Sequence, residues 1–244
     1  MKESAGFGWT VLLPVKVLAQ AKSRLAQLAG ERRHELALAL ASDTVSAVVA
    51  CPRVARVIVV TSDPVAGPRL SSLGALIVPE VIPEAGPGAR SRADRENPRQ
   101  SPPLSPDGSQ HLLNGALLRG AAVAARRWPG TGLAALTADL PALRPAELAA
   151  ALRAASDTGG AAFVPDAAGL GTTMYAVVPG AQFRPMYGGA SRARHAAGGA
   201  AELALDGIAG LRQDVDTPDD LRAAVALGVG PRTAEVAGEL LADA

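Results

Sequence analysis

Two short acidic stretches follow apolar runs in the sequence, at positions where a strand would end. The first places Asp139 after residues 133–137, and the second places Asp214 and Asp216 after Leu211. An aspartate at the tip of a buried strand points to the place where ligands bind in open α/β sheets. Mg²⁺ commonly binds through one or two carboxylates together with substrate phosphates. The two stretches therefore indicate a divalent-cation site and phosphoryl or nucleotidyl transfer chemistry.

Structural roles compete for these acidic residues. Asp139 stands two residues before Pro141, where an aspartate often caps a turn. Residues 217–220 read Thr-Pro-Asp-Asp, a helix start whose acids favour the helix dipole, so the last two need no function. Asp214 and Asp216 alternate along an expected strand, so only one of them would face the site with Asp139. We favour Asp214, which is closer to the strand.

Three cations, Lys16, Lys22 and Arg24, fall in one loop after the first expected strand. Such side chains would bind phosphates, arginine bidentately and lysine as a point charge. Ordinary solvated surface charges are the alternative, and the commoner case for such residues taken alone. The loop has no Walker A pattern of glycines, which disfavours a P-loop NTPase.

Two glycine-containing segments are candidate anion sites. Residues 169–173 join two expected strands, and there the backbone would approach an anion or simply form a hairpin turn. Ser191 stands at the expected N-cap of a short basic helix, where free amides bind anions or the serine is a plain cap. Zinc sites and hydrolytic triads lack support, because the histidines have no ligand-like spacing: His34, His111 and His195.

The composition excludes several classes of function. The 24 basic and 23 acidic side chains nearly cancel, so no global field favours nucleic acid or a membrane surface. Cys51 is the only cysteine, which excludes a disulfide framework and a cysteine-based metal site. No apolar stretch is long enough to cross a bilayer, and residues 9–15 are too short and too β-like for a signal peptide. We expect a cytoplasmic protein.

The pattern of apolar residues predicts one α/β domain over residues 1–244, with a mostly parallel sheet and helices on both faces. Strands are expected at 9–15, 54–61, 75–78, 133–137, 161–164, 173–178 and 211–215, and helices at 31–50, 65–73, 112–127, 145–155 and 218–227.

One segment, residues 83–110, does not fit this alternation. It holds six of the 19 prolines, four arginines, four acids and a single large aliphatic residue, Leu104. Such a composition cannot bury enough surface to offset the entropy of ordering the chain. We interpret it as a disordered or lid-like insertion, with disorder favoured.

Deleting residues 85–106 is expected to leave folding intact, because their composition supports no core. Thermal unfolding of the shortened and full-length chains tests this expectation. A large loss of thermal stability in the shortened chain would show that the segment is packed.

Taken together and in this order, the motifs resemble the phosphoenolpyruvate or 2-phospho-L-lactate guanylyltransferases, which serve the biosynthesis of the deazaflavin coenzyme F-420. The resemblance spans nearly the whole chain apart from 83–110, where the family usually has a short acidic and proline-containing turn. It is carried by residues 13–25, 113–117, 138–141, 171–173, 188–195 and 214–218.

The resemblance implies a nucleotide-diphospho-sugar-transferase-like fold, a Rossmann-like three-layer sandwich. It implies that Asp139 and Asp214 hold Mg²⁺, with Asp216 nearby. By the same carry-over, Thr173, Gly188 and Ser191 would hold the phosphorylated three-carbon acid. Lys16, Lys22 and Arg24 would face the GTP phosphates, and Asn114 is a weaker candidate for nucleotide contact.

The implied reaction joins GMP from GTP to the phosphate of phosphoenolpyruvate and releases pyrophosphate. The attacking phosphate oxygen is already ionised near neutral pH, so positioning and charge neutralisation take the place of a general base. The Ala-, Arg- and Gly-rich composition is typical of actinobacterial members, which favours phosphoenolpyruvate over 2-phospho-L-lactate. Hand-over of the product to the next transferase of the pathway stays open at this stage.

Two alternatives stay open at this stage. Another nucleotidyltransferase of this fold, of the molybdenum-cofactor or sugar-phosphate type, would typically carry a glycine-rich loop after the first strand. Here no glycine occurs between that strand and Gly30, which favours the guanylyltransferases. A non-catalytic nucleotide-binding regulator is the alternative from a different class.

Overall fold

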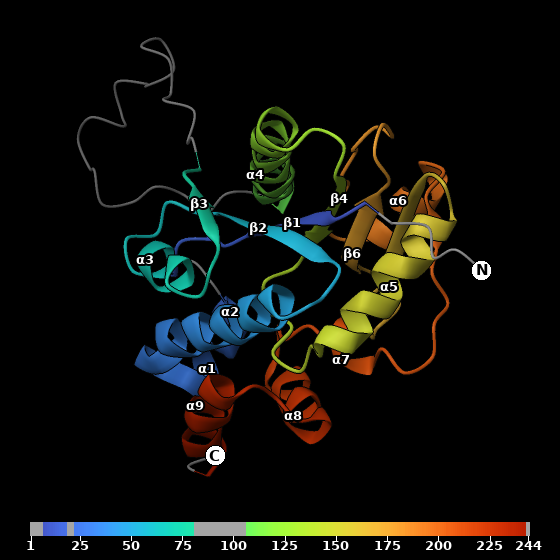
Figure 1. The fold of residues 1–244 in the computed structure, drawn as a ribbon. Helices are drawn as coiled ribbons and strands as arrows, with labels where there is room; N and C mark the ends of the chain where they lie inside the picture. The colour runs from blue at the N-terminus through green and yellow to red at the C-terminus, as the bar shows by residue number, and fades with distance from the viewer. Residues whose placement is uncertain (1–6, 19–21, 81–105, 243–244) are drawn as a thin grey trace, which may run out of the picture.

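The computed structural model describes residues 7–18, 22–80 and 106–242, and its framework is a seven-stranded sheet (Figure 1). The strand order is β3-β2-β1-β4-β6-β5-β7. Only β6 runs antiparallel to its neighbours, so the predicted mostly parallel sheet is confirmed. The strands are β1 (Trp9–Pro14), β2 (Val54–Val60), β3 (Leu76–Val78), β4 (Gly132–Leu136), β5 (Ala161–Pro165), β6 (Thr172–Val177) and β7 (Ala201–Glu202).

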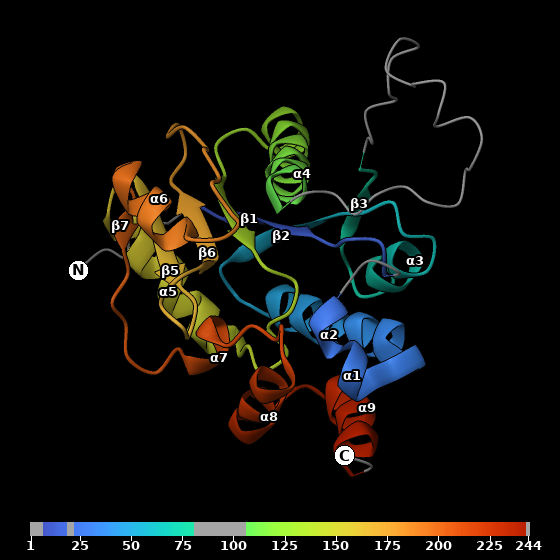
Figure 2. The same cartoon turned by 180° about the vertical axis from the view of Figure 1, so that it is seen from behind.

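Helices cover both faces of the sheet (Figures 1 and 2). Helix α4 packs on one face and α2, α3 and α5 on the other, while α8 and α9 form a further layer against α2. The helices are α1 (Ala26–Ala29), α2 (Arg33–Val49), α3 (Ala66–Ser71), α4 (Pro106–Arg127), α5 (Pro145–Asp157), α6 (Ser191–Ala197), α7 (Ala209–Arg212), α8 (Pro218–Leu227) and α9 (Pro231–Ala242). Two 3-10 turns, Ser23–Leu25 and Gly30–Arg32, flank α1.

The central strand β1 shows how the sequence builds this core. Trp9, Val11 and Leu13 pack on the α2 side, and Leu12 packs on the α4 side, because successive side chains of a strand point to opposite faces. All four side chains are fully buried. Each such burial contributes roughly 1.5–3 kcal/mol of hydrophobic stabilisation. The strand is therefore a rigid base for the loop that follows it.

The connections place a topological switch point between β1 and β4. The chain leaves β1 toward β2 and β3 on one side of the sheet, and β4 then pairs with β1 on the other side. Ligands bind in open α/β sheets where the strand order reverses in this way, outside the carboxyl ends of the strands. The start of the antiparallel strand β6 lies at this same edge. Chemistry is therefore expected where β1, β4, β5 and β6 meet.

The expected strand over residues 211–215 is wrong. The chain forms the short helix α7 there and then a loop. Ile208 and Leu211 are both buried, and their three-residue spacing suits one side of a helical turn better than one side of a strand. Residues 211–215 also have only one long apolar pair, Leu211 and Val215, which does not favour either structure over the other.

The insertion expected at 83–110 is described only at its end. Helix α4 begins at Pro106, so residues 106–110 belong to this helix and not to the insertion. Residues 83–105 of the expected insertion lie outside the described residues. A proline at the start of a helix is compatible with its first turn, where no backbone N–H is needed.

A buried aspartate joins α2 to α9. The Asp43 carboxylate accepts a hydrogen bond from the Thr233 backbone nitrogen at 2.7 Å and from Arg232 Nη1 at 3.2 Å. It thereby satisfies one of the N–H groups that the first turn of α9 leaves without an intrahelical partner. Gly230 precedes this turn, and a Cβ there would collide with Asp43.

Replacing Asp43 with alanine is expected to lower the free energy of unfolding by about 1–3 kcal/mol, because buried donors lose their acceptor. Urea unfolding measures the change. Asp206→Ala, which truncates an exposed aspartate, is the matched control and should shift stability by less than about 0.5 kcal/mol. Equal effects of the two substitutions would contradict the capping role.

Candidate active site

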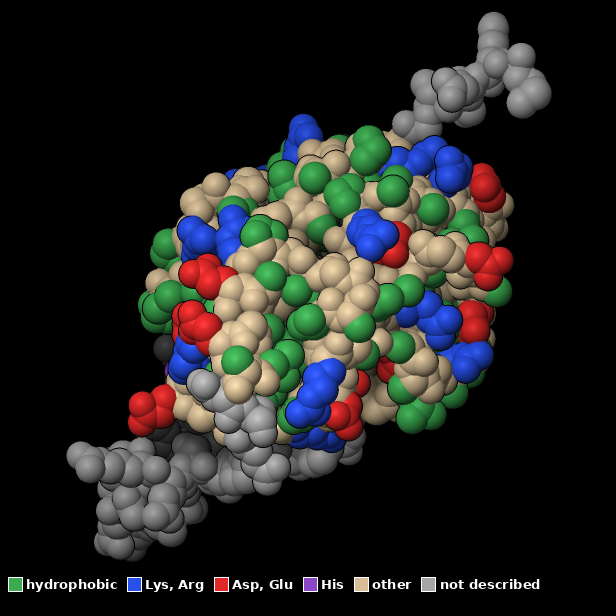
Figure 3. Space-filling model, turned by 90° about the horizontal axis from the view of Figure 1, so that it is seen from below, with side chains coloured by type: hydrophobic (Ala, Val, Ile, Leu, Met, Phe, Trp, Pro, Cys, Tyr) green, Lys and Arg blue, Asp and Glu red, His purple; other side chains and the backbone are tan. Residues whose placement is uncertain are grey.

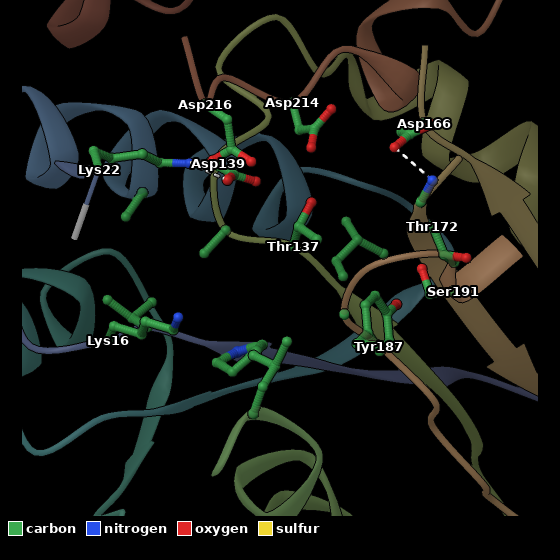
Figure 4. Close-up of a pocket in the computed structure, with 18 of the residues that line it drawn as sticks. Lys16, Lys22, Thr137, Asp139, Asp166, Thr172, Tyr187, Ser191, Asp214 and Asp216 are labelled. Carbon is green, nitrogen blue, oxygen red and sulfur yellow. Dashed lines mark hydrogen bonds and ion pairs between the residues drawn. The ribbon is translucent and has the colours of Figure 1, made fainter. Parts of the chain in front are cut away.

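A cavity of about 450 Å³ opens at the switch point, at the carboxyl edge of the sheet (Figure 4). It contains every site residue predicted from the sequence except Asn114 and Thr173. Its walls follow β1, β4 and β5 and include the start of β6 and the loop before α6. The polar side chains that line it are Lys16, Lys22, Arg24, Thr137, Asp139, Asp166, Thr172, Tyr187, Ser191, Asp214 and Asp216.

Lys22 joins two of the predicted acidic residues. Its ammonium group donates hydrogen bonds to Asp139 Oδ2 and to Asp216 Oδ1, the second at 2.8 Å (Figure 4). Burial alone lowers the pKa of Lys22, but the two carboxylates outweigh burial and raise it. Lys22 is therefore a cation at neutral pH, held between two segments that are far apart in the sequence.

The backbone of Lys22 is strained. Its φ of 55° lies in the left-handed region, and within the described ranges it is the only non-glycine residue with a positive φ. Such a conformation costs on the order of 1–3 kcal/mol, and strain of this kind clusters at functional sites. The two ion pairs of the side chain offset this cost and keep the ammonium group in the cavity.

Asp214 and Asp216 both line the cavity, which corrects the expectation that only one of them faces it. They lie in the loop between α7 and α8, so the alternation of a strand does not apply. Val215 between them is buried, and its nitrogen donates to the Asp139 carbonyl oxygen at 3.1 Å. This contact fixes the loop beside the end of β4.

Negative charge exceeds positive charge among these groups. Burial and the carboxylates of Asp139, Asp216 and Asp166 raise the pKa of Asp214 to about 7. Burial also raises the pKa of Asp216, but Lys22 and the more distant arginine and lysine of the loop after β1 lower it overall. Three carboxylates face one ammonium group, so this part of the cavity favours a further cation.

The oxygen donors here suit Mg²⁺. Asp139 Oδ1 is buried and has no hydrogen-bond partner in the part of the chain that the structure describes. Within the same residues, no three acidic, histidine or cysteine side chains are arranged as a complete metal site. Mg²⁺ usually takes one or two protein carboxylates together with substrate phosphates. Asp139 and its neighbours therefore fit a cation that binds together with its substrate.

Lys16 and Arg24 are exposed on the same wall as Lys22. The loop that carries them is anchored by Asp63, which accepts a hydrogen bond from the Leu18 nitrogen at 2.8 Å. Burial raises the pKa of Asp63, but its three backbone N–H donors lower it overall. Asp63 follows the end of β2, so an acid after an apolar run was the signal that could have found it.

The opposite wall is a loop of glycines before α6. Gly188 and Gly189 have φ values of 105° and 38°, which favour glycine. The Asn114 side chain accepts from the Tyr187 nitrogen at 2.9 Å and donates to the Tyr187 carbonyl oxygen at 3.2 Å. The structure therefore places Asn114, a candidate for nucleotide contact, as a support of this loop and not in the cavity wall.

Ser191 lies in the cavity wall, but it is not the N-cap that the sequence predicted. The N-cap position is Ala190, and Ser191 is the first residue of α6, with a buried side chain. Ser191 and Thr172 lie next to each other at the end of the cavity that Asp166 and Tyr187 also border, which we call the acid end (Figure 4).

Thr172, and not the predicted Thr173, lines the cavity. The two residues are consecutive in β6 and point to opposite faces of the sheet. The Thr173 side chain is fully buried, and its Oγ1 has no hydrogen-bond partner among the described residues. The Gly-Thr-Thr pattern located this part of the site but did not show which hydroxyl faces the ligand.

Asp166 was missed by sequence analysis. It follows β5 and accepts from the nitrogens of Leu170 at 2.9 Å and Gly171 at 2.7 Å, which closes the β5–β6 hairpin (Figure 4). A Cβ on Gly171 would collide with its carboxylate. Asp166 stands two residues after the apolar run 161–164, the same signal that drew attention to Asp139.

Elsewhere the surface charges are mixed. On the face shown in Figure 3, basic and acidic side chains are interspersed, without a broad patch of one sign. Among the described residues, no helix combines the length and the apolar character that crossing a membrane requires.

The fold is of the nucleotidyltransferase type. A nucleotidyl transferase from Methanothermobacter thermautotroptrophicus superposes with a TM-score of 0.54 and 17% identity, covering 91% of this chain and 97% of that one. A protein from Desulfovibrio desulfuricans assigned to the nucleotide-diphospho-sugar transferases has a TM-score of 0.51 and 12% identity, covering 90% and 96%. The predicted nucleotide-diphospho-sugar-transferase-like fold is confirmed.

Sequence relatives identify the family. The phosphoenolpyruvate guanylyltransferase of Thermomonospora curvata is 51% identical over 232 residues, covering 95% of this chain and 90% of the relative. The same-named proteins of Streptosporangium roseum and Streptomyces coelicolor are 50% and 51% identical, covering 96% of this chain and 92% and 97% of theirs. No protein-family model matches the chain. The chain belongs to the phosphoenolpyruvate guanylyltransferase family, which confirms the resemblance carried by its motifs.

The pH dependence of stability is expected to include a contribution from His195, which is fully buried behind the acid end of the cavity. Burial, with a smaller contribution from Arg194, lowers the pKa of His195 to about 4. The unfolded chain binds this proton below about pH 6.5, while the folded chain stays neutral until about pH 4. The contribution of His195 to the free energy of unfolding is therefore fully present above pH 6.5, and it falls by up to roughly 3 kcal/mol as the pH drops to 4.

Denaturant unfolding between pH 4 and 8 measures this contribution. His195→Asn, which cannot take up the proton, should flatten the profile by that amount relative to the unchanged chain. Replacing the exposed His34 with asparagine is the matched control and should leave the slope unchanged. Parallel profiles for the unchanged chain and His195→Asn would contradict the lowered pKa.

Proposed function

We propose that this chain transfers GMP from GTP to the phosphate of phosphoenolpyruvate, forming enolpyruvyl-diphospho-guanosine and pyrophosphate in coenzyme F-420 biosynthesis. One observation carries the proposal: a single cavity holds cations and carboxylates on one wall and glycines and hydroxyl groups on the other. The names of the relatives, which match nearly the full chain, support the same reaction.

The two walls suit two different ligands. Lys16, Lys22 and Arg24 would bind the phosphates of GTP, where arginine contributes a bidentate contact and lysine a point charge. Gly188 and Ser191, both in the cavity wall, would hold the phosphorylated acid, whereas Thr173, which does not line the cavity, is left out of this set. The arrangement would place the two substrates end to end across the switch point.

The reaction needs alignment more than proton transfer. A phosphate oxygen of the acid forms the new bond to the α-phosphorus of GTP, and the bond to the pyrophosphate oxygen breaks. The attacking oxygen is already ionised at neutral pH, so no side chain has to remove a proton. The cationic wall would stabilise the negative charge that gathers on the departing pyrophosphate.

Asp139, Asp214 and Asp216 would hold Mg²⁺, as the unpartnered Asp139 Oδ1 suggests. When bound, the ion supplies charge neutralisation for the phosphates. Lys22 would hold Asp139 and Asp216 close together and oriented before substrates bind.

We expect purified protein with Mg²⁺, GTP and phosphoenolpyruvate to release pyrophosphate, which a coupled phosphate assay measures. Pyrophosphate release with 2-phospho-L-lactate but not with phosphoenolpyruvate would show that 2-phospho-L-lactate is the acid substrate. The proposed guanylyl transfer would then still stand. Finding no release with either acid, with GTP or with ATP, would overturn the proposal.

The same assay separates an enzyme from a nucleotide-binding regulator. Asp139→Asn and Asp214→Asn should reduce turnover by at least about a hundredfold, the scale of losing one electrostatic group at a reacting centre. Asp206→Asn, on an exposed residue outside the cavity, is the control and should keep full turnover.

A further inference from the structure

His195 does not line the cavity, but it contacts two segments that border the acid end. Its Nδ1 lies 3.0 Å from Thr172 Oγ1, and its Nε2 lies 2.9 Å from the backbone nitrogen of Met186. The first contact reaches the start of β6, and the second reaches the loop that leads to Gly188. The ring is fully buried.

Aromatic rings hold this imidazole in place. The Tyr175 ring stacks on it with centroids 4.6 Å apart and an interplanar angle of 16°. The Tyr187 ring meets it edge-on at 5.4 Å, and Phe163 lies at 5.8 Å. Such pairs stabilise beyond the area they bury. The position of the ring is therefore set by packing as well as by its two hydrogen bonds.

The two hydrogen bonds determine where the ring carries its proton. A backbone nitrogen only donates, so Nε2 must be the unprotonated acceptor of the Met186 N–H. In a neutral imidazole the proton then resides on Nδ1, which donates to Thr172 Oγ1. Burial disfavours the charged ring, in agreement with this assignment.

A directed hydroxyl group follows from this tautomer. Because Thr172 Oγ1 accepts from His195, its own proton points elsewhere. Among the described residues Thr172 Oγ1 makes no second hydrogen bond, and Thr172 lines the cavity. The Thr172 hydroxyl is thus left as a donor toward whatever occupies the acid end.

The loop on the other side is held just as firmly. Arg194 donates to the carbonyl oxygens of Met186 and Gly188, and Asn114 holds Tyr187 at both its nitrogen and its oxygen. With the His195 contact to the Met186 nitrogen, the residues before Gly189 are tied to α4 and α6. The distance between this loop and Thr172 is thereby set.

We propose that His195 is a positioning residue that presents the Thr172 hydroxyl as a hydrogen-bond donor to an anionic oxygen of the phosphorylated acid. Thr172 would contact the substrate directly, and His195 would act through it. The inference rests on the proposed function for the identity of the acid, but the tautomer and the donor do not depend on it.

Thr172→Val and Thr172→Ser test the donor. We expect Thr172→Val to weaken binding of phosphoenolpyruvate roughly tenfold to a hundredfold, the range for losing a hydrogen bond to a charged group. The KM for GTP should change little, and Thr172→Ser should stay close to the unchanged chain. Thr233→Val, which removes a buried threonine hydroxyl in α9, is the control for the valine substitution. Equal KM values for phosphoenolpyruvate in Thr172→Val and Thr233→Val would overturn the role of Thr172.

His195→Asn and His195→Gln test the positioning role. An asparagine amide nitrogen replaces Nδ1 and still donates to Thr172, whereas a glutamine oxygen replaces Nε2 and accepts from Met186. We expect His195→Asn to keep the KM for phosphoenolpyruvate within about threefold, and His195→Gln to raise it about as much as Thr172→Val. A purely structural histidine would make both variants shift KM alike, in step with their loss of thermal stability.

A direct measurement separates this inference from the proposed function. Nitrogen NMR of histidine-labelled protein without substrates should show His195 with its proton on Nδ1, assigned by the loss of that signal in His195→Asn. A proton on Nε2 would overturn the inference even if turnover is found. Calorimetric binding of phosphoenolpyruvate, weakened by Thr172→Val, would support it even if no turnover with GTP is found.

Discussion

Repulsion among the carboxylates of Asp139, Asp214 and Asp216 is the constraint on which the rest of the site depends. Two like charges about 4 Å apart at a protein surface repel by roughly 4 kcal/mol. Lys22 relieves part of this repulsion by pairing with Asp139 and Asp216. Asp214 has no such partner among the described residues, and its raised pKa reports the charge that is left. This remaining negative charge is the basis of the proposed Mg²⁺ site.

The scaffold holds this repulsion in place. The turn after β4 is tied to α2 by the Leu140 nitrogen, which donates to Thr44 Oγ1 at 2.9 Å. The loop with Asp214 and Asp216 is tied to the same turn through Val215. Because β1, β4 and α2 are packed on all sides, neither segment can move away to relax the charges. The buried Ala-, Val- and Leu-rich core thus determines where the aspartates stand.

The two walls of the cavity use opposite electrostatics. One wall carries the cations and the carboxylates of Asp139, Asp214 and Asp216. On the other, backbone groups, hydroxyls and a buried neutral histidine lie beside a single carboxylate, that of Asp166. A nucleophile that is already an anion needs no base, but it needs donors that face it. In the proposed reaction, the wall of glycines and hydroxyl groups would supply such donors to the phosphorylated acid.

Much of the architecture could be predicted from the sequence. The apolar runs within residues 54–60 and 133–136 located two strands of the sheet, because buried parallel strands are nearly continuous apolar runs. The search for an aspartate at the end of an apolar run found Asp139. The same search applied to every apolar run would also have found Asp63 and Asp166. The prediction of a strand failed for residues 211–215, where a few apolar residues fit a helical turn as well as a strand.

The sequence by itself determined the family, the parallel sheet and the residue types that gather at its carboxyl edge, because these follow from local periodicity and ordered motifs. Only the tertiary structure decided which side chains meet. It joined Lys22 to Asp139 and Asp216, placed Asn114 behind the glycine loop, and exchanged Thr173 for Thr172 in the cavity wall. It also buried His195 between Tyr175 and Thr172. These outcomes depend on contacts between residues that are far apart in the chain, and on which face of β6 turns toward the site.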